Sequence, residues 1–348
     1  MAAYIGPVDR DTEVLVIGAG MVGALIAWQL AESGLDVSVV DAQTVGSGAT
    51  RRSLGLATPS LQRAHRRQTA RGVEALDTLA RQHNLKPRPV SVLHVASQLD
   101  DADTLRGLVA ELQADGLDAG WEIDPAVVPG AFGGGLRVAN SIMVDPVLFT
   151  TRLLQRPNIV VKQNVEIQKL ERAHGCVLAL APGYSVRAGA VVLATSAYTG
   201  LLSPYLADSM QVARGTLWRS HPQPIALACH SMPVLVDGGR IAAAQTTDMR
   251  VCVQAWRWNN RTDGDPTHDA RAYLNAHMLE LLSETETWLS AISIASRDGG
   301  PLVGTLSGND RSSGGNVFYA LAPGAFGLAW APIIAEQVIN LALRSPRK

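Results

Sequence analysis

The first forty residues contain the pattern that most limits how this chain can fold. Four apolar residues, Val14-Leu-Val-Ile17, precede Gly18-Ala-Gly20-Met-Val-Gly23, and a second apolar run, Val37-Ser-Val-Val40, ends at Asp41. Short all-apolar runs predict parallel strands that are buried on both faces. The glycines predict a turn into a helix over residues 21–33. The chain therefore begins with a predicted strand–helix–strand unit.

The three glycines have the spacing of a dinucleotide-binding turn. Gly18 permits the sharp turn, Gly20 lets the backbone approach a pyrophosphate, and Gly23 lets the helix pack closely on the strand. The start of the helix offers backbone N–H groups and a partial positive charge to the phosphates. Asp41 stands where a carboxylate can accept hydrogen bonds from the adenosine ribose. This fingerprint does not by itself separate FAD from NAD.

The composition excludes several other classes of protein. The chain has 348 residues, of which 47% are hydrophobic and 18% are charged, and its formal net charge is −1. It is therefore not a disordered chain, and it has no overall positive field that would attract nucleic acid. The length favours two domains. Cys176, Cys229 and Cys252 have no metal-type spacing and the histidines are scattered, so we expect a reduced, cytoplasmic protein without a metal site.

One segment, residues 14–31, is apolar enough to resemble a membrane span. Its three glycines favour a strand, a turn and a helix instead. The residues before it are acidic and form no basic leader, so we expect neither a signal peptide nor a transmembrane segment.

The rest of the chain alternates between predicted helices and short strands. We expect helices at residues 61–83, 100–115, 268–289 and 327–344, and one that begins near residue 146. We expect strands at residues 90–96, 159–171, 177–186 and 191–194, and several short ones within 217–254 and 301–321. Residues 121–140 have the composition of a loop. The order predicts a nucleotide-binding domain built from separated segments, with a β-sheet domain inserted between them.

Further stretches resemble one family, in the order in which that family carries them. They are Gly46-Ser-Gly-Ala-Thr-Arg-Arg-Ser-Leu-Gly55, Val165 in the strand 164–170, Val191-Val-Leu-Ala-Thr-Ser-Ala197, Asp298-Gly-Gly-Pro-Leu-Val-Gly304 and Ala322-Pro-Gly-Ala-Phe-Gly327. Together they resemble the D-amino-acid oxidase family of FAD-dependent oxidoreductases, in its glycine oxidase and sarcosine oxidase branch. The resemblance implies an α/β fold, in which a Rossmann-type FAD-binding domain carries an inserted antiparallel β-sheet substrate domain. It places the FAD-binding domain at residues 1–86, 141–212 and 295–348, and the substrate domain at 87–140 and 213–294.

The resemblance also implies FAD as the cofactor. No cysteine occurs near residues 293–300, where one branch of the family attaches its flavin, so we expect FAD to be bound noncovalently. The residues expected to bind it are Gly18, Ala19, Gly20, Met21, Val22, Gly23, Asp41, Ala42, Gly48, Ala49, Thr50, Arg51, Arg52, Ser53, Leu54, Gly55, Val165, Ala194, Thr195, Ser196, Gly324, Ala325, Phe326, Gly327 and Leu328. A helix that starts near Gly327 can stabilise negative charge on a reduced flavin.

The substrate side departs from the family pattern. The family commonly binds a substrate carboxylate with an arginine five residues before its Asp-Gly-x-Pro run, and this chain has Ser293 there. Pro323 replaces the histidine of the family's Gly-His motif, and Ser196 replaces a glycine. The groups expected to face substrate instead are Ser293, Gln245 and Arg250, with Arg257, Trp256 and Trp258 as further candidates.

A basic segment follows the second motif. Six arginines occur between residues 51 and 71, and no acid occurs between Ala42 and Val73. Because aromatic residues are not interleaved with them, we do not expect a nucleic-acid partner. We expect Arg51 and Arg52 beside the cofactor phosphates, and Arg63, Arg66, Arg67 and Arg71 on a solvated helix face.

The sequence therefore predicts an FAD-dependent enzyme that oxidises the C–N bond of a small amine or amino acid by hydride transfer to flavin, with O2 or a protein partner as electron acceptor. One alternative is the flavin-bearing subunit of a heteromeric amino-acid or opine-type dehydrogenase. A second alternative is a non-catalytic flavin-binding protein. An NAD-linked dehydrogenase explains only the first fingerprint.

Overall fold

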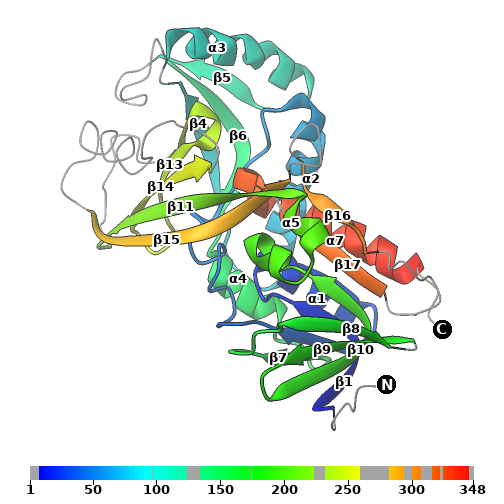
Figure 1. Cartoon of the computed structure of the whole chain (residues 1–348). Coiled ribbons are helices and arrows are strands. Elements are labelled where there is room, and N and C mark those ends of the chain that lie inside the picture. Colours follow the sequence, from blue (N-terminus) through cyan, green and yellow to red (C-terminus); the bar gives the residue numbers. More distant parts are fainter. Residues whose placement is uncertain are drawn as a thin grey trace.

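The fold consists of two β-sheets with helices packed on them (Figure 1). The computed structural model describes residues 8–96, 98–123, 134–173, 175–222, 232–258, 282–293, 300–306, 316–321 and 324–344. No helix within these ranges is long and apolar enough to cross a membrane. The fold class is the predicted one: a mixed α/β fold with a Rossmann-type unit and a largely antiparallel sheet.

The first sheet contains the predicted strand–helix–strand unit. Its strands lie in the order β16-β17-β10-β1-β2-β7, and β8 and β9 continue it beyond β10. The strands are β1 (Arg10–Ile17), β2 (Val37–Val40), β7 (Ile159–Lys162), β8 (Lys169–Ala173), β9 (Cys176–Ala181), β10 (Tyr184–Leu193), β16 (Leu302–Thr305) and β17 (Asn316–Leu321). The central strands β17, β10, β1, β2 and β7 are parallel to one another.

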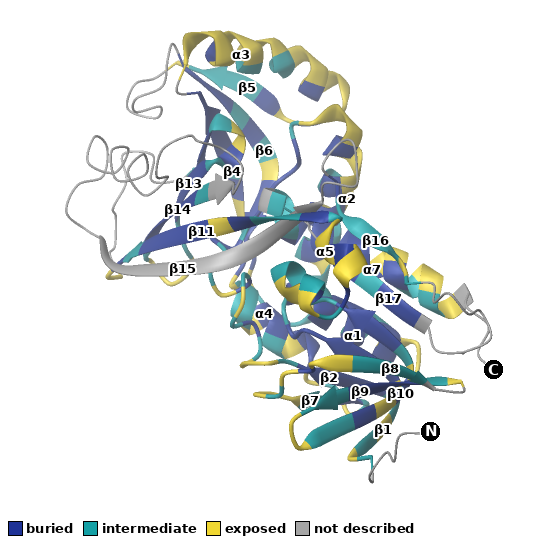
Figure 2. Ribbon diagram, in the orientation of Figure 1, coloured by how far each residue is buried: buried dark blue, intermediate teal, exposed yellow. Residues whose placement is uncertain are grey.

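Both faces of this sheet are covered at its centre, which is why the central parts of its strands, such as Val14–Ile17 of β1, are largely apolar. Val14 and Val16 face one core, which they share with α1 (Met21–Glu32), α2 (Arg63–Gln82), α4 (Pro146–Leu153) and α7 (Gly327–Arg344). Leu15 and Ile17 face the opposite core, under β9 and β10. Alternate side chains of one strand thus enter different cores. Most residues in the central parts of β1, β2, β10 and β17 are buried, whereas most of β7 at the sheet edge is not (Figure 2).

The second sheet is almost entirely antiparallel. Its order is β15-β11-β14-β13-β12-β4-β6-β3, with β5 paired to β6, and only β4 and β12 run parallel. Its strands are β3 (Leu56–Ala57), β4 (Arg88–Val95), β5 (Ala119–Glu122), β6 (Gly135–Met143), β11 (Met210–Ser220), β12 (Val234–Val236), β13 (Ile241–Gln245), β14 (Val251–Trp258) and β15 (Leu282–Ser293). The helix α3 (Leu99–Ala114) packs on β4, β5 and β6.

The strands of the two sheets largely follow the predicted division of the chain. All strands of the first sheet lie within 1–86, 141–212 and 295–348. In the second sheet, β3 lies outside the predicted substrate segments, and β6 and β11 each cross a predicted boundary. The domain boundaries themselves stay a prediction.

Four local predictions were wrong. The predicted strand 159–171 is two strands, β7 and β8, and residues 163–168 between them belong to neither. Residues 121–140 are not simply a loop, because β5 ends at Glu122 and β6 begins at Gly135. The predicted strand 177–186 is a hairpin of β9 and β10, which turns at Gly183 with a φ of 70°. Residues 282–289 belong to β15 and not to a helix, because they pair with β11 along its length, and such pairing overrides local helix propensity. Residues 268–281 lie outside the described residues.

Arg66 is buried, which corrects the expectation of a solvated arginine face on α2. Its side chain is 2% exposed and forms an ion pair with Asp115 at the end of α3, with Glu111 3.6 Å away. A second N–H group donates to the carbonyl oxygen of Leu61. Arg66 therefore joins α2 to α3, while Arg63 and Arg67 are exposed.

The contact between α2 and α7 depends on Gly72. A Cβ atom at this position would lie 1.8 Å from the carbonyl oxygen of Ala329 in α7. We predict that Gly72→Ala lowers the free energy of unfolding by about 1–3 kcal/mol, because the two backbones must separate. The matched control is Gly107→Ala in α3, where a Cβ meets nothing within 4 Å. That variant should raise stability by about 0.5–1 kcal/mol. Thermal unfolding of both variants, followed by circular dichroism, should move the midpoint in opposite directions.

His94 is a buried, unpaired histidine in the second sheet. It lies on β4 between Leu136 of β6 and Leu235 of β12, and neither ring nitrogen has a hydrogen-bond partner. Burial lowers the pKa of His94 from its ordinary value of 6.5 to about 4. The folded chain therefore holds this imidazole neutral over a pH range in which the unfolded chain protonates it.

This histidine predicts a specific acid sensitivity. Below pH 6.5 the unfolded chain binds a proton that the folded chain does not, so His94 makes stability fall as the pH drops toward 4, by on the order of 3 kcal/mol in total. We expect the midpoint temperature of unfolding to depend less on pH in His94→Leu than in the wild type between pH 6.5 and 4.5. The exposed His221 provides the control, and His221→Leu should keep the wild-type slope. Equal slopes in His94→Leu and wild type would contradict the prediction.

Candidate functional site

The turn after β1 requires two of its glycines because three backbone segments meet there. Gly18 has a φ of 108°, and a Cβ atom on it would lie 2.5 Å from the carbonyl oxygen of Ala194 at the end of β10. A Cβ atom on Gly23 would lie 1.9 Å from the carbonyl oxygen of Gly18. The close approach of α1 to β1 and β10 thus excludes any side chain at either position.

The start of α1 is open to an anion. Gly20 is the N-cap and places no side chain over the helix end, and the first turn contains no acidic residue. The N–H of Met21 donates to the Thr50 hydroxyl at 3.0 Å, which brings the segment 46–55 against the helix start. A Cβ atom on Gly20 would meet only that hydroxyl, at 3.3 Å. The diphosphate of a dinucleotide fits this cradle, because the helix dipole and the backbone N–H groups favour negative charge.

Asp41 organises the neighbouring loops. One carboxylate oxygen accepts from the N–H of Ala19 at 2.7 Å, and the other accepts from the N–H of Gln43 at 2.8 Å. The N–H of Val165 donates to the carbonyl oxygen of Asp41 at 3.0 Å. Asp41 and Val165 are far apart in sequence, and the structure brings them together beside the glycine turn. Both are partly exposed there.

Main-chain and side-chain bonds hold the segment 46–55 in place. The N–H of Gly46 donates to the carbonyl oxygen of Ala19 at 2.9 Å. The Arg52 guanidinium donates to the carbonyl oxygens of Ser47 and Gly48, so it braces its own segment. At the other end Gly55 has a φ of 75°, and a Cβ on it would lie 2.1 Å from the carbonyl oxygen of Val144.

Two other predicted cofactor segments end close to this turn. The N–H of Ala194 donates to the carbonyl oxygen of Ile17 at 2.8 Å, so the end of β10 lies beside the end of β1. Ser196 has a φ of 52° and begins the short helix η1 (Ser196–Leu201). The turn η3 (Gly324–Phe326) leads directly into α7, with Gly324 at a φ of 62°.

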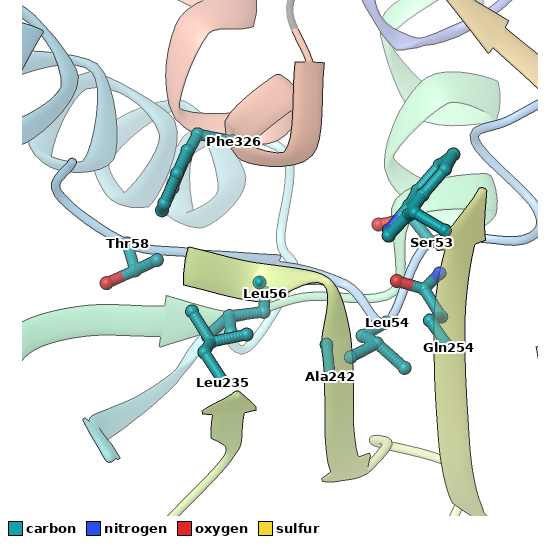
Figure 3. Close-up of a pocket in the computed structure, with 10 residues that line it drawn as sticks. Ser53, Leu54, Leu56, Thr58, Leu235, Ala242, Gln254 and Phe326 are labelled. Carbon is teal, nitrogen blue, oxygen red and sulfur yellow. The ribbon is translucent and has the colours of Figure 1, made fainter. Parts of the chain in front are cut away.

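A small cleft, partly open to solvent, lies between these segments and the second sheet. Figure 3 shows Phe326, Ser53 and Leu54 of the predicted cofactor segments facing side chains of the second sheet. The lining residues are Ser53, Leu54, Leu56, Thr58, Leu235, Gly239, Ala242, Gln254, Trp256 and Phe326. Apolar side chains with a few polar groups among them, here Ser53, Thr58 and Gln254, are typical of the lining of a small-molecule site. Trp256, one of the further candidates from the sequence, lies in this cleft.

Gln245 and Arg250, two of the three residues first expected to face substrate, are not among the described residues that line this cleft. Gln245 ends β13 and Arg250 precedes β14, so both lie at the β13–β14 turn. There the Gln245 amide donates to the carbonyl oxygen of Met249 at 3.3 Å, and Arg250 forms an ion pair with Asp248 at 3.2 Å. Ser293 ends β15, where its backbone pairs with Met210. The side chains of Ser293, Arg257 and Trp258, and all of Arg297 and Pro323, lie outside the described residues.

Gln254 and Thr58 are polar cleft residues that sequence reasoning missed, and Gln254 is the one that also contacts an expected cofactor segment. It lies on β14 in the run Val251-Cys-Val-Gln-Ala255 and is 7% exposed. Its Nε2 donates to the carbonyl oxygen of Arg52. The available signal was a lone amide within an otherwise apolar strand, since a buried polar side chain needs a partner.

Comparison with known proteins identifies the family. The sequence matches the family described as FAD dependent oxidoreductase (DAO) over residues 13–341. Two curated relatives are both named tRNA 5-methylaminomethyl-2-thiouridine biosynthesis bifunctional protein MnmC. The one from Marinobacter nauticus is 24% identical over 371 aligned residues, which cover 98% of this chain and 57% of the relative. The one from Maricaulis maris is 32% identical over 126 residues, 35% of this chain and 20% of the relative. The chain thus spans only part of each relative.

Solved structures share the whole fold. Glycine oxidase from Geobacillus kaustophilus superposes with a TM-score of 0.78 at 16% identity, covering 97% of this chain and 96% of that one. Iminodiacetate oxidase from Chelativorans sp. BNC1 gives 0.76 at 20% identity and covers 96% of each chain. L-proline dehydrogenase from P. horikoshii gives 0.76 at 17% identity, with 97% and 95% covered.

The family match extends over both sheets, so it includes the glycine turn and the cleft. It confirms the predicted cofactor, FAD, and it confirms that the chain is an oxidoreductase. Noncovalent attachment of the FAD stays a prediction. The chain belongs to the family of FAD-dependent oxidoreductases typified by D-amino-acid oxidase.

Proposed function

We propose that this chain oxidises the C–N bond of a small amine or amino acid by hydride transfer to FAD. The observation that carries this proposal is the cleft, in which Phe326 and Ser53 of the expected cofactor segments face Gln254 and Trp256 of the second sheet. A substrate held by the sheet is then beside a flavin held by those segments. Bound FAD supplies the two-electron acceptor, and the chain's residues orient the substrate and exclude water.

The FAD contacts in this proposal are the residues named from the sequence. Gly20 and the start of α1 receive the pyrophosphate, Asp41 the ribose, and Val165 the adenine side. Thr50 fixes the segment 46–55 across the helix start. The remaining expected contacts, in 48–55, 194–196 and 324–328, border the cleft or the glycine turn.

The electron acceptor in the proposal is O2 or a protein partner, at a cytoplasmic location. A heteromeric dehydrogenase is the second candidate, and one surface feature favours it. Tyr198, Leu201 and Tyr205, on η1 and the short helix α5 (Pro204–Ala207), are 52%, 73% and 66% exposed. They follow directly on the end of β10, beside the proposed flavin site, and exposed apolar side chains that gather in this way can mark a contact surface. Co-purifying subunits, with fast reduction of dyes and slow reduction of oxygen, would favour this candidate.

An anaerobic flavin-reduction screen tests the proposed chemistry. The panel contains amino acids, N-methyl amines and opines, and also a methylaminomethyl-bearing nucleoside because the curated relatives carry that group in their name. We expect a substrate to bleach the flavin absorption band at about one equivalent, since one two-electron oxidation reduces one flavin. A flavin that dithionite reduces but no member of the panel reduces would contradict the proposal and favour a non-catalytic flavin-binding protein.

Replacement of Gly20 tests where the pyrophosphate lies. We predict that Gly20→Leu abolishes flavin retention, because the side chain occupies the space through which the diphosphate approaches the helix start. Gly107→Leu places the same side chain where nothing lies within 4 Å and should keep wild-type flavin content. The measurement is the flavin-to-protein absorbance ratio after purification and reconstitution with FAD. A Gly20→Leu protein that still purifies with its yellow flavin would contradict the proposed position of the diphosphate.

A further inference from the structure

The orientation of the Gln254 amide is fixed by chemistry. Its side-chain nitrogen lies within hydrogen-bond distance of the Arg52 carbonyl oxygen. A carbonyl oxygen only accepts, so the amide must present its N–H there, and the reverse orientation would oppose two oxygens. Oε1, the atom left for the cleft that Gln254 lines, is therefore an acceptor only.

The side chains around Gln254 Oε1 determine which kind of hydrogen-bond donor this oxygen can accept from. On the same face of the sheet, Gln254 has Ala242 of β13 and Leu217 of β11 as its cross-strand neighbours. Trp256 lies two positions along the strand, and Phe326 enters the cleft from η3. An acceptor between apolar and aromatic side chains is suited to an N–H group, above all that of a protonated amine, which aromatic rings also stabilise.

The same amide joins the substrate side to the cofactor side. Gln254, which lies on β14, donates a hydrogen bond to the carbonyl oxygen of Arg52. Arg219 of β11 donates one to the adjacent carbonyl oxygen of Arg51 at 2.6 Å. Both carbonyl groups belong to the segment expected to lie against FAD. The position of Oε1 is therefore set relative to that segment, and not only relative to the sheet.

We propose that Gln254 Oε1 accepts a hydrogen bond from the N–H of the bound amine, which makes Gln254 a specificity-determining residue for primary and secondary amines over their N-trimethylated analogues. This inference rests on the proposed function and names the substrate class of its site. Gln254 Nε2 at the same time donates to the Arg52 carbonyl oxygen and so fixes the position of the segment 46–55 beside the cleft.

The test compares two ligands across variants. The ligands are the secondary amine that reduces wild-type flavin most effectively in the screen and its N-trimethylated analogue, which is cationic but has no N–H. Their dissociation constants are measured by titration of the holoprotein, from flavin spectral changes and by calorimetry. Gln254→Met should weaken binding of the secondary amine by about 10- to 100-fold, as expected for loss of one hydrogen bond to a charged group. It should change binding of the analogue by less than about threefold, because no N–H is involved.

A second variant separates the two bonds of the amide. Gln254→Glu keeps an oxygen for the cleft but has no donor for the Arg52 carbonyl, so it should preserve discrimination between the ligands while flavin retention falls. Gln113→Met is the control: Gln113 also donates to a carbonyl oxygen, that of Ala119 at 2.8 Å, but it lies on α3. It should leave ligand binding and flavin content unchanged.

Each outcome decides the inference. If Gln254→Met discriminates between the ligands as wild type does, Gln254 does not bind the amine, although the proposed function stands. If Gln254→Met loses its flavin, the comparison is made with Gln254→Glu that retains FAD. If that holoprotein binds the secondary amine and its N-trimethylated analogue without discrimination, the assignment is overturned. If no amine reduces wild-type flavin, the proposed function fails first and the role of Gln254 fails with it.

Discussion

The approach of three backbone segments at Gly18 and Gly23 is the constraint on which the site depends. The end of β1, the start of α1 and the end of β10 meet so closely that a single methyl group would collide with a carbonyl oxygen. This contact fixes where the positive end of α1 lies. Thr50 then binds the helix start and Asp41 the turn, so the segments 46–55 and 41–45 take their positions from it. The cofactor side of the cleft is thus built outward from a glycine turn.

Much of this cofactor side could be predicted from the sequence because its signals are local. A strand, three glycines at fixed spacing and a helix lie within a few dozen residues, and each has one main physical interpretation. Strand β10 was recognisable at its buried end for the same reason. The pairing of β15 with β11 was not, since its sequence lacks a regular alternation of polar and apolar residues and suits a helix or a strand until a partner strand is known.

The substrate side was harder to predict because its contacts join distant residues. Gln254 meets Arg52 across about two hundred positions of sequence, and Arg66 meets Asp115 across two helices. An arginine or glutamine in isolation usually faces water, and only the fold shows which ones are buried. The resemblance to a family was sound for the fold and the cofactor. The substrate-facing residues that it suggested, Gln245 and Arg250, stay a prediction, and they lie at the turn of the hairpin that carries Gln254 and Trp256.

The two sheets are connected through main-chain oxygens, and this has a consequence for how such a protein can change. Arg219 donates a hydrogen bond to the main-chain carbonyl oxygen of residue 51, and Gln254 donates one to that of residue 52. Every amino acid has this carbonyl group. These two hydrogen bonds between the second sheet and the segment 46–55 therefore do not depend on which amino acids occupy positions 51 and 52. Pocket residues such as Ala242 can therefore be replaced, and the chemistry of the pocket changed, while the distance between the bound substrate and the flavin is retained.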